Sequence, residues 1–83
     1  MTVVRIYTKD RCVQCDMSKR LMKRLGIEYV EEDATDAGNL AAFKELGFLA
    51  APVVTAGESR DDMWSGFRPD KINELAERIK EEK

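Results

Sequence analysis

The residues of this sequence best suited to chemistry are two cysteines, Cys12 and Cys15, with the spacing Cys-x-x-Cys. They are predicted to begin a helix, and a helix N-terminus has unpaired N–H groups and about half a positive charge, which stabilise an anion. We therefore expect Cys12 to be a solvent-accessible thiolate with a pKa below the value of about 8.5 for free cysteine, and Lys9 and Arg11 act in the same direction. Cys15 lies one turn later, so we expect it to face inward and to come close enough to Cys12 for a disulfide.

Other uses of two cysteines fit the sequence less well. A tetrahedral zinc site takes four Cys or His ligands, and the chain has two Cys and no His. A structural disulfide that closes so short a loop constrains the unfolded chain less than one that closes a long loop. Two inert buried thiols would not explain the paired spacing at the start of a helix. A redox-active pair is therefore the favoured interpretation, and its strand–helix–strand context strengthens it.

The segments on either side of the cysteines predict a strand and then a helix. Residues 2–8 are rich in Val, Ile, Tyr and Thr, which indicates a strand, expected in the middle of a sheet. The basic residues of the next segment alternate with apolar ones in a helical period, and Gly26 is suited to follow the end of that helix. The apolar positions that we expect on its buried face are Val13, Met17, Leu21, Met22 and Leu25.

A second strand and helix are predicted between Gly26 and Gly47. Residues 27–32 form the strand, and Thr35 or Asp36 can cap a helix that stops at Gly47. The apolar positions of this helix are Leu40, Phe43 and Leu46. Two strands joined by a helix that packs on the sheet form a parallel pair with a right-handed connection.

The second half of the chain predicts a hairpin and a last helix. Residues 52–55, a turn at 56–58 and residues 59–64 suggest two short strands that close the sheet. Pro69 and Asp70 fit the first turn of a helix. Its expected buried stripe is Ile72, Leu75, Ala76 and Ile79. The order βαβαββα follows, which is an α/β fold in a single domain spanning residues 1–83.

Length and charge narrow the function further. With 83 residues the chain is just long enough for one apolar core, and it has no apolar run near the roughly 20 residues that span a bilayer. No export signal is recognised at the N-terminus, so we expect a soluble, cytoplasmic protein that does not bind membranes. We expect a monomer, because one core uses up the apolar stripes and transient exchange favours small contacts. Residues 1–25 carry seven Lys or Arg and two Asp, whereas the total charge is −2. This asymmetry fits either a solvated basic helix face or electrostatic steering, and no nucleic-acid motif accompanies it.

Three segments together carry a family resemblance: Tyr7 to Cys15 (Tyr-Thr-Lys-Asp-Arg-Cys-Val-Gln-Cys), Ala51-Pro52-Val53, and Trp64 to Asp70 (Trp-Ser-Gly-Phe-Arg-Pro-Asp). They resemble the NrdH-redoxins, the glutaredoxin-like electron donors of class Ib ribonucleotide reductase. The resemblance spans nearly the whole chain. It implies a thioredoxin/glutaredoxin-like fold, with a four-stranded mixed sheet flanked by three helices.

The resemblance also implies the reaction and the partners. Cys12 would attack a disulfide in the large subunit of class Ib ribonucleotide reductase, and Cys15 would resolve the mixed disulfide. An NADPH-dependent thioredoxin reductase would then reduce the Cys12–Cys15 pair. The chain itself has no G-x-G-x-x-G motif, so we expect it to bind no cofactor. The alternatives are a glutathione-dependent glutaredoxin with the same fold, or a module whose cysteines hold copper or an iron–sulfur cluster, whose four ligands would need a dimer or outside thiols.

Further residues are assigned to partner binding by the same resemblance. It implies a cis peptide at Ala51–Pro52 that leaves the backbone of Ala51 and Val53 free to pair with an extended partner segment, although an ordinary proline at the start of a strand fits the sequence as well. Phe67 and Arg68 stand where glutathione-binding relatives have small residues, and they would cover that groove. Trp64 and Phe67 would equally suit the core. The full predicted partner surface is Lys9, Arg11, Val13, Gln14, Ala51, Pro52, Val53, Trp64, Ser65, Gly66, Phe67 and Arg68.

One part of the motif region departs from the family. Members often carry Pro and Asn in the loop before the cysteines, where this chain has Asp10 and Arg11. The exchange adds opposite charges beside Cys12. We therefore expect the direction of its pKa shift to hold, with a size that depends on both charges.

Overall fold

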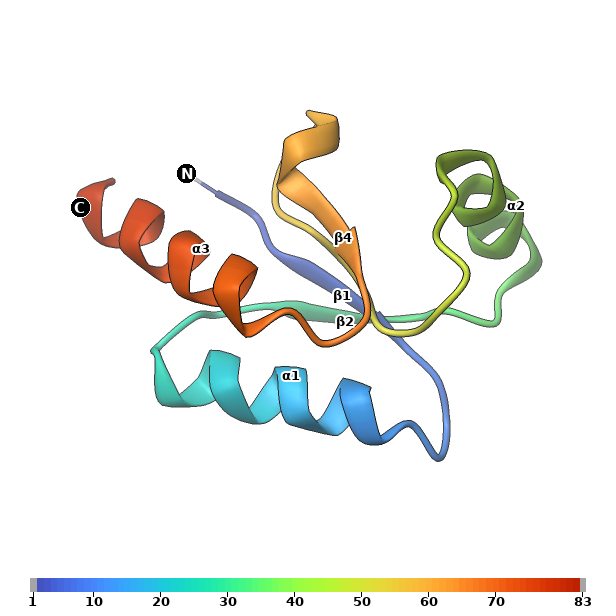
Figure 1. Cartoon of the computed structure of the whole chain (residues 1–83), viewed down its shortest axis with the longest axis horizontal. Helices are drawn as coiled ribbons and strands as arrows, with labels where there is room; N and C mark the ends of the chain where they lie inside the picture. Colours follow the sequence, from blue (N-terminus) through green and yellow to red (C-terminus); the bar gives the residue numbers. More distant parts are fainter. Residues whose placement is uncertain (1, 83) are drawn as a thin grey trace.

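Four strands form one mixed sheet in the computed structural model, which describes residues 2–82 (Figure 1). The strands are β1 (Arg5–Thr8), β2 (Val30–Asp33), β3 (Val53–Thr55) and β4 (Met63–Ser65). Their order across the sheet is β2–β1–β3–β4, with β1 parallel to β2 and antiparallel to β3, and β3 antiparallel to β4. The predicted four-stranded mixed sheet, with the first strand inside it, is confirmed.

Three helices cover this sheet: α1 (Val13–Arg24), α2 (Ala37–Leu46) and α3 (Pro69–Glu81). Figure 1 shows α1 and α3 as neighbours, with α2 apart from both. The rings of Tyr7 and Phe43 meet edge to face with centroids 4.9 Å apart, so α2 packs on the face of β1 opposite to Ile6. The predicted order βαβαββα is confirmed. Among the described residues no helix combines the length and the apolar character that crossing a membrane requires.

A row of side chains across three strands forms the centre of the core. Ile6 lies opposite Val54, and Val54 lies opposite Trp64, so the three share one face of the sheet. All three are buried. The cluster around them is completed by Val4, Met22, Ile27, Ala56, Ile72 and Leu75, with Ala76 and Ile79 packed at its edge. The stripe predicted for the last helix is therefore confirmed.

The predicted buried face of α1 is wrong in part. Val13 and Met17 are 72% and 42% exposed, and Leu25 is also exposed, whereas the buried residues of the helix are Cys15, Ser18 and Met22. Two of these three buried side chains, Cys15 and Ser18, are small. A search for large apolar residues at helical spacing passes over such positions. It therefore predicted that the neighbouring face of the helix is buried.

Two strand boundaries and the hairpin also differ from the prediction. β1 begins at Arg5 rather than residue 2, and β2 occupies 30–33 rather than 27–32. Ile27 is buried but lies before the strand, because β2 joins the sheet only where the Val30 N–H reaches the carbonyl of Val4 at 2.9 Å. Residues 59–64 are not one strand: a short 3₁₀ helix, η1 (Arg60–Asp62), precedes β4. The Ser59 hydroxyl caps η1, which competes with an extended backbone there.

Candidate active site

Cys12 is the N-cap residue of α1, and its sulfur accepts a hydrogen bond from the backbone N–H of Cys15 at 3.1 Å. The two cysteines form a disulfide with their Cα atoms 5.2 Å apart. Cys12 is 9% exposed and Cys15 is 1% exposed. The placement of the pair at the start of a helix is confirmed, as is the deeper position of Cys15. The expectation that Cys12 is open to solvent is wrong in the disulfide form, in which its sulfur is bonded to that of the buried Cys15.

The loop before Cys12 holds its backbone in a rarely used conformation. Arg11 has φ +55°, a left-handed value that a side chain with a Cβ adopts at a cost. This turn brings the chain from the end of β1 to the extended N-cap conformation of Cys12. Lys9 and Arg11 are both exposed, and with Cys12 they line one side of a cleft. Arg11 is therefore beside the cysteine, as predicted. Its left-handed backbone also makes the turn that leads into Cys12.

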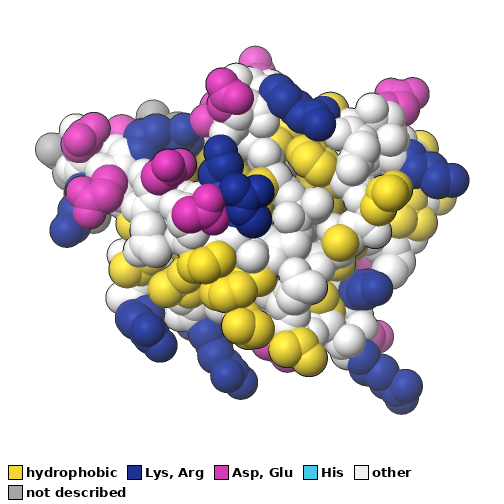
Figure 2. Space-filling model, viewed as in Figure 1, with side chains coloured by type: hydrophobic (Ala, Val, Ile, Leu, Met, Phe, Trp, Pro, Cys, Tyr) yellow, Lys and Arg dark blue, Asp and Glu magenta, His cyan; other side chains and the backbone are white. Residues whose placement is uncertain are grey.

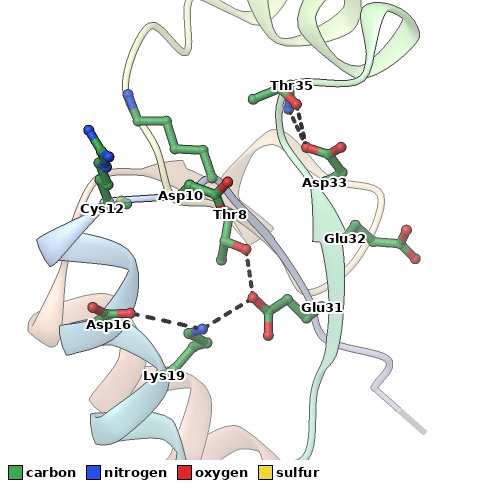
Figure 3. A pocket seen from close by; sticks show the side chains of 11 residues that line it. Thr8, Asp10, Cys12, Asp16, Lys19, Glu31, Glu32, Asp33 and Thr35 are labelled. Carbon is green, nitrogen blue, oxygen red and sulfur yellow. Dashed lines mark hydrogen bonds and ion pairs between the residues drawn. The ribbon is translucent and has the colours of Figure 1, made fainter.

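The cleft beside Cys12 has a volume of about 680 Å³ and contains an ion-pair network (Figure 3). The Thr8 hydroxyl donates to the Glu31 carboxylate at 2.7 Å, and the Lys19 ammonium donates to the same oxygen at 3.1 Å. The hydrogen bond from Thr8, followed by that from Lys19, holds the pKa of Glu31 below its ordinary value. Glu31 in turn raises the pKa of Lys19.

The sequence analysis did not assign Thr8, Lys19 or Glu31 to the site. The three come from β1, α1 and β2, and their contact depends on the parallel pairing of β1 with β2. The one available signal was the position of Lys19, four residues after Cys15 on the same helix.

The segment before β3 contains a cis peptide bond between Ala51 and Pro52, as the family resemblance implied. Pro52 and Val53 are buried, and Val53 lies inside the sheet opposite both Tyr7 and Ser65. The backbone of Val53 is therefore flanked by strands on both sides, so the prediction that it is free to pair with a partner is wrong. Ala51, which precedes the sheet and is half-buried, is the residue of this segment that remains for pairing with a partner.

The loop between β4 and α3 is hydrogen-bonded to the Cys-x-x-Cys segment and to the segment before β3. The Gly66 N–H donates to the carbonyl of Pro52 at 2.8 Å, and the Phe67 N–H donates to the side-chain oxygen of Gln14 at 2.8 Å. Gly66 has φ +82°, and a Cβ there would lie 3.2 Å from the same Gln14 oxygen. Gln14, Pro52 and Gly66 are thus brought together as the resemblance implied, and only glycine suits the central position without strain.

The remaining predicted residues of this loop have different environments. Phe67 is half-buried against the core, whereas the exposed Arg68 guanidinium donates twice to the Asp70 carboxylate, at 3.2 and 2.9 Å. This contact raises the pKa of Arg68 and lowers that of Asp70. Ser65 is half-buried on β4. Trp64 is only 5% exposed, so its assignment to a partner surface is corrected: strand register directs its indole into the core.

Apolar side chains also gather on the outer surface next to the cysteines. Figure 2 shows them over α1 and the start of α3, with basic side chains at the lower edge. The exposed apolar residues of α1 are Val13 and Met17, and Leu25 follows the helix at its far end. Val13 follows Cys12 directly, so a partner that reaches the sulfur also meets this surface.

Comparisons with known proteins agree with this geometry. The sequence profile of the glutaredoxin family matches residues 4–60. The glutaredoxin-like protein NrdH of Salmonella typhimurium is 42% identical over 78 residues, which cover 87% of this chain and 86% of that protein. NrdH of Lactococcus lactis is 36% identical over 76 residues, which cover 89% of this chain and all of that protein.

Solved structures give the same picture. NrdH-redoxin of Escherichia coli, a glutaredoxin-like protein with a thioredoxin-like activity profile, superposes with a TM-score of 0.75 at 41% identity, covering 87% of this chain and 92% of that one. A glutaredoxin of Archaeoglobus fulgidus shares the fold with a TM-score of 0.67 at 21% identity, covering 90% and 86%. With its Cys12–Cys15 pair at the start of α1, the chain belongs to the glutaredoxin family, within the NrdH group of glutaredoxin-like thiol–disulfide oxidoreductases.

Proposed function

We propose that this protein is a cytoplasmic electron donor to class Ib ribonucleotide reductase and is itself reduced by an NADPH-dependent thioredoxin reductase. The disulfide at the helix N-terminus, with the Cys15 N–H directed at the Cys12 sulfur, carries the chemical part of the proposal. The partners are supported by the similarity to NrdH proteins and by the thioredoxin-like activity profile of the E. coli relative.

The reaction begins with the reduced protein. The Cys12 thiolate attacks a disulfide of the acceptor, forms a bond to one acceptor sulfur and releases the other as a thiolate, which takes up a proton. Cys15 then loses its proton and attacks the Cys12 sulfur. The Cys12–Cys15 disulfide forms, and the second acceptor sulfur leaves. Two electrons have passed to the acceptor, and attack by a reductase thiolate on Cys12 reverses the sequence.

The helix N-terminus favours this order of events. The Cys15 N–H and the positive end of α1 stabilise negative charge on Cys12, so Cys12 is the thiol that ionises first. Of the two cysteines Cys12 is the less buried, so an external disulfide reaches it before it reaches Cys15. Cys15 is buried and is therefore suited to react only with the sulfur that is already bonded to Cys12.

The loop before α3 supports thioredoxin reductase rather than glutathione as the source of electrons. The Phe67 N–H already donates to Gln14, and the Arg68 guanidinium already binds Asp70. A glutathione molecule at this position would have to replace contacts made within the protein. The half-buried Phe67 ring adds bulk where a glutathione groove needs small residues.

The surface that would receive either protein partner surrounds Cys12. We assign to it the exposed Lys9 and Arg11 of the loop before Cys12, the exposed Val13 on the helix, the half-buried Ala51 and the exposed Arg68. Ala51 is placed for a short strand-like contact with an extended partner segment. A flexible tail that carries a disulfide fits such a site better than a rigid domain does.

One assay separates the two possible electron donors. The oxidised protein is mixed with NADPH and a disulfide substrate, and either thioredoxin reductase or glutathione with glutathione reductase is added. We expect NADPH consumption with thioredoxin reductase, and its loss in the Cys12→Ser variant. Consumption only with glutathione would contradict the proposal. A second arm replaces the substrate with purified class Ib ribonucleotide reductase, and deoxyribonucleotide formation that depends on this protein is the expected result.

A further inference from the structure

Ser18 is a fully buried residue whose hydroxyl has no hydrogen-bond partner among the described residues. It is 0% exposed and lies in the middle of α1. Buried hydroxyl groups are almost always hydrogen-bonded, and a serine inside a helix usually bonds back to the carbonyl four residues earlier. Ser18 makes no such bond. A hydroxyl without a partner in one state of a protein suggests a partner in another state.

The residue one turn before Ser18 is Cys15, which is also buried. Residues three apart on a helix are neighbours, with about 5–6 Å between their Cβ atoms. Helical side chains tilt toward the N-terminus, so the Ser18 hydroxyl leans toward the Cys15 position. With Met22 the two residues make up the buried stripe of α1. The helix therefore places a buried hydroxyl, without a partner in the described part of the chain, one turn from the resolving cysteine.

We propose that the Ser18 hydroxyl donates a hydrogen bond to the Cys15 thiolate during disulfide exchange. In the disulfide the Ser18 hydroxyl has no partner within residues 2–82, so it is free to turn to Cys15 once that sulfur is released as an anion, which is a stronger acceptor than a neutral sulfur. The Cys12 sulfur already has a donor, the Cys15 N–H. Ser18 supplies the corresponding donor to the second sulfur, which is otherwise an anion in an apolar environment.

The step in which Ser18 acts is the cleavage of the disulfide. A thiolate of the reductant attacks the Cys12 sulfur, the Cys12–Cys15 bond breaks, and Cys15 leaves with the electron pair as a thiolate. The Ser18 hydroxyl keeps its proton and stabilises this leaving group, which later takes a proton from solvent. A leaving thiolate of lower pKa departs faster. In the reverse direction the same contact increases the fraction of Cys15 that is ionised.

The charged groups on the neighbouring elements do not take over the role of Ser18 as hydrogen-bond donor to Cys15. On α1 itself, Asp16 and Lys19 have opposite signs and their charged atoms are 4.0 Å apart. From β2, Glu31 is occupied by Thr8 and Lys19. The buried residues that β1 and α3 contribute to the core on this side of the sheet are apolar: Ile6, Ile72 and Leu75. Ser18 is thus the uncharged donor on the buried face of the helix.

The test compares three variants of the full chain. Ser18→Ala removes the hydroxyl, Ser18→Thr keeps it, and Met22→Leu perturbs the packing of the same buried stripe one turn later without touching a polar group. The ¹³Cβ chemical shifts of Cys12 and Cys15 in the reduced protein are followed against pH, and the rate of reduction of the disulfide by dithiothreitol is measured. Urea denaturation records the stability of each variant.

We expect Ser18→Ala to lower the acid dissociation constant of Cys15 about tenfold, as for a lost hydrogen bond to a charged group. Reduction by dithiothreitol becomes severalfold slower, whereas the titration of Cys12 changes little. Ser18→Thr restores the Cys15 titration, and Met22→Leu lowers stability only. An unchanged Cys15 titration in Ser18→Ala, or an equal change in Met22→Leu, would overturn the proposal. The inference depends on the Cys12–Cys15 redox pair and not on the electron donor, so its failure leaves the proposed function intact.

Discussion

The side-chain oxygen of Gln14 accepts a hydrogen bond from the backbone N–H of Phe67 at 2.8 Å, and this contact joins the Cys-x-x-Cys segment to the loop before α3 across 53 residues of sequence. Gly66, next to Phe67, donates to Pro52. The three segments that surround the disulfide are therefore held as one unit, although no two of them are adjacent in the chain.

Removing the Gln14 acceptor should loosen this unit. Gln14→Ala leaves the Phe67 N–H without its partner, and we expect a loss of about 1 kcal/mol of unfolding free energy in urea titrations. Gln14→Glu keeps an acceptor oxygen at the same position and serves as the matched control, with stability near that of the unchanged protein. Equal destabilisation by both variants would contradict the importance of this hydrogen bond.

Arg11 gives a second prediction, because its φ of +55° is tolerated better by some residues than by others. Asparagine adopts left-handed backbone more readily than other residues with a Cβ, so Arg11→Asn should be neutral or slightly stabilising. Arg11→Val places a β-branched side chain in this conformation and should cost about 1–2 kcal/mol. Thermal denaturation of the two variants in parallel measures the difference. A Val variant as stable as the Asn variant would mean that the turn rearranges.

The Thr8–Glu31 hydrogen bond predicts a pH-dependent contribution to stability. The folded pKa of Glu31 lies below the ordinary value of 4.5, so the network stabilises the protein above about pH 4.5 and loses this effect as the pH falls through the folded pKa. Thr8→Val removes the first cause of the shift. Because Glu31 is partly exposed, we expect a destabilisation of only about 0.5–1 kcal/mol at pH 7.

Two measurements check this effect of Thr8. Urea denaturation at pH 7 and pH 3 should show the difference between Thr8→Val and the unchanged protein shrinking at the lower pH. Carboxyl NMR titration should show the pKa of Glu31 moving back toward its ordinary value in the variant. A difference that is the same at both pH values would indicate a packing defect rather than a lost hydrogen bond.

The separate roles of the cysteines predict opposite behaviour of two serine variants. Cys12→Ser should abolish disulfide reduction, because it removes the attacking sulfur. Cys15→Ser should accumulate a mixed disulfide with the acceptor, because nothing resolves the bond to Cys12. Non-reducing gel electrophoresis with an acceptor protein distinguishes them. Trapping by the Cys12→Ser protein instead would reverse the assignment.

The sequence predicted the elements far better than it predicted which side chains they bury. Strand and helix order follow from local periodicity, and Gly47 ends α2 with φ +79° as expected. The buried face of α1 was misassigned because two of its buried residues, Cys15 and Ser18, are small and do not stand out in a pattern of large apolar side chains. Which face of a helix meets a sheet depends on partners that are distant in sequence.

In the candidate site, too, the sequence predicted some features and missed others. Cys12, Cys15 and the Ala51–Pro52 segment were found from motifs. The Thr8–Lys19–Glu31 network was not, because three separate elements contribute to it and only strand pairing brings them together. Trp64 was assigned to a surface because of its motif, yet the register of β3 with β4 turns its side chain into the core. Motifs identify reactive groups, whereas register decides which neighbours they have.

The most direct test of Cys12 as the attacking thiolate is the rate of alkylation of the reduced protein by iodoacetamide as a function of pH, with the modified cysteine identified by mass spectrometry. We expect Cys12 to react first, with a pKa well below the value of about 8.5 for free cysteine. Cys15 should react only at higher pH. Titration of both thiols at the value of free cysteine, or earlier reaction of Cys15, would contradict the mechanism.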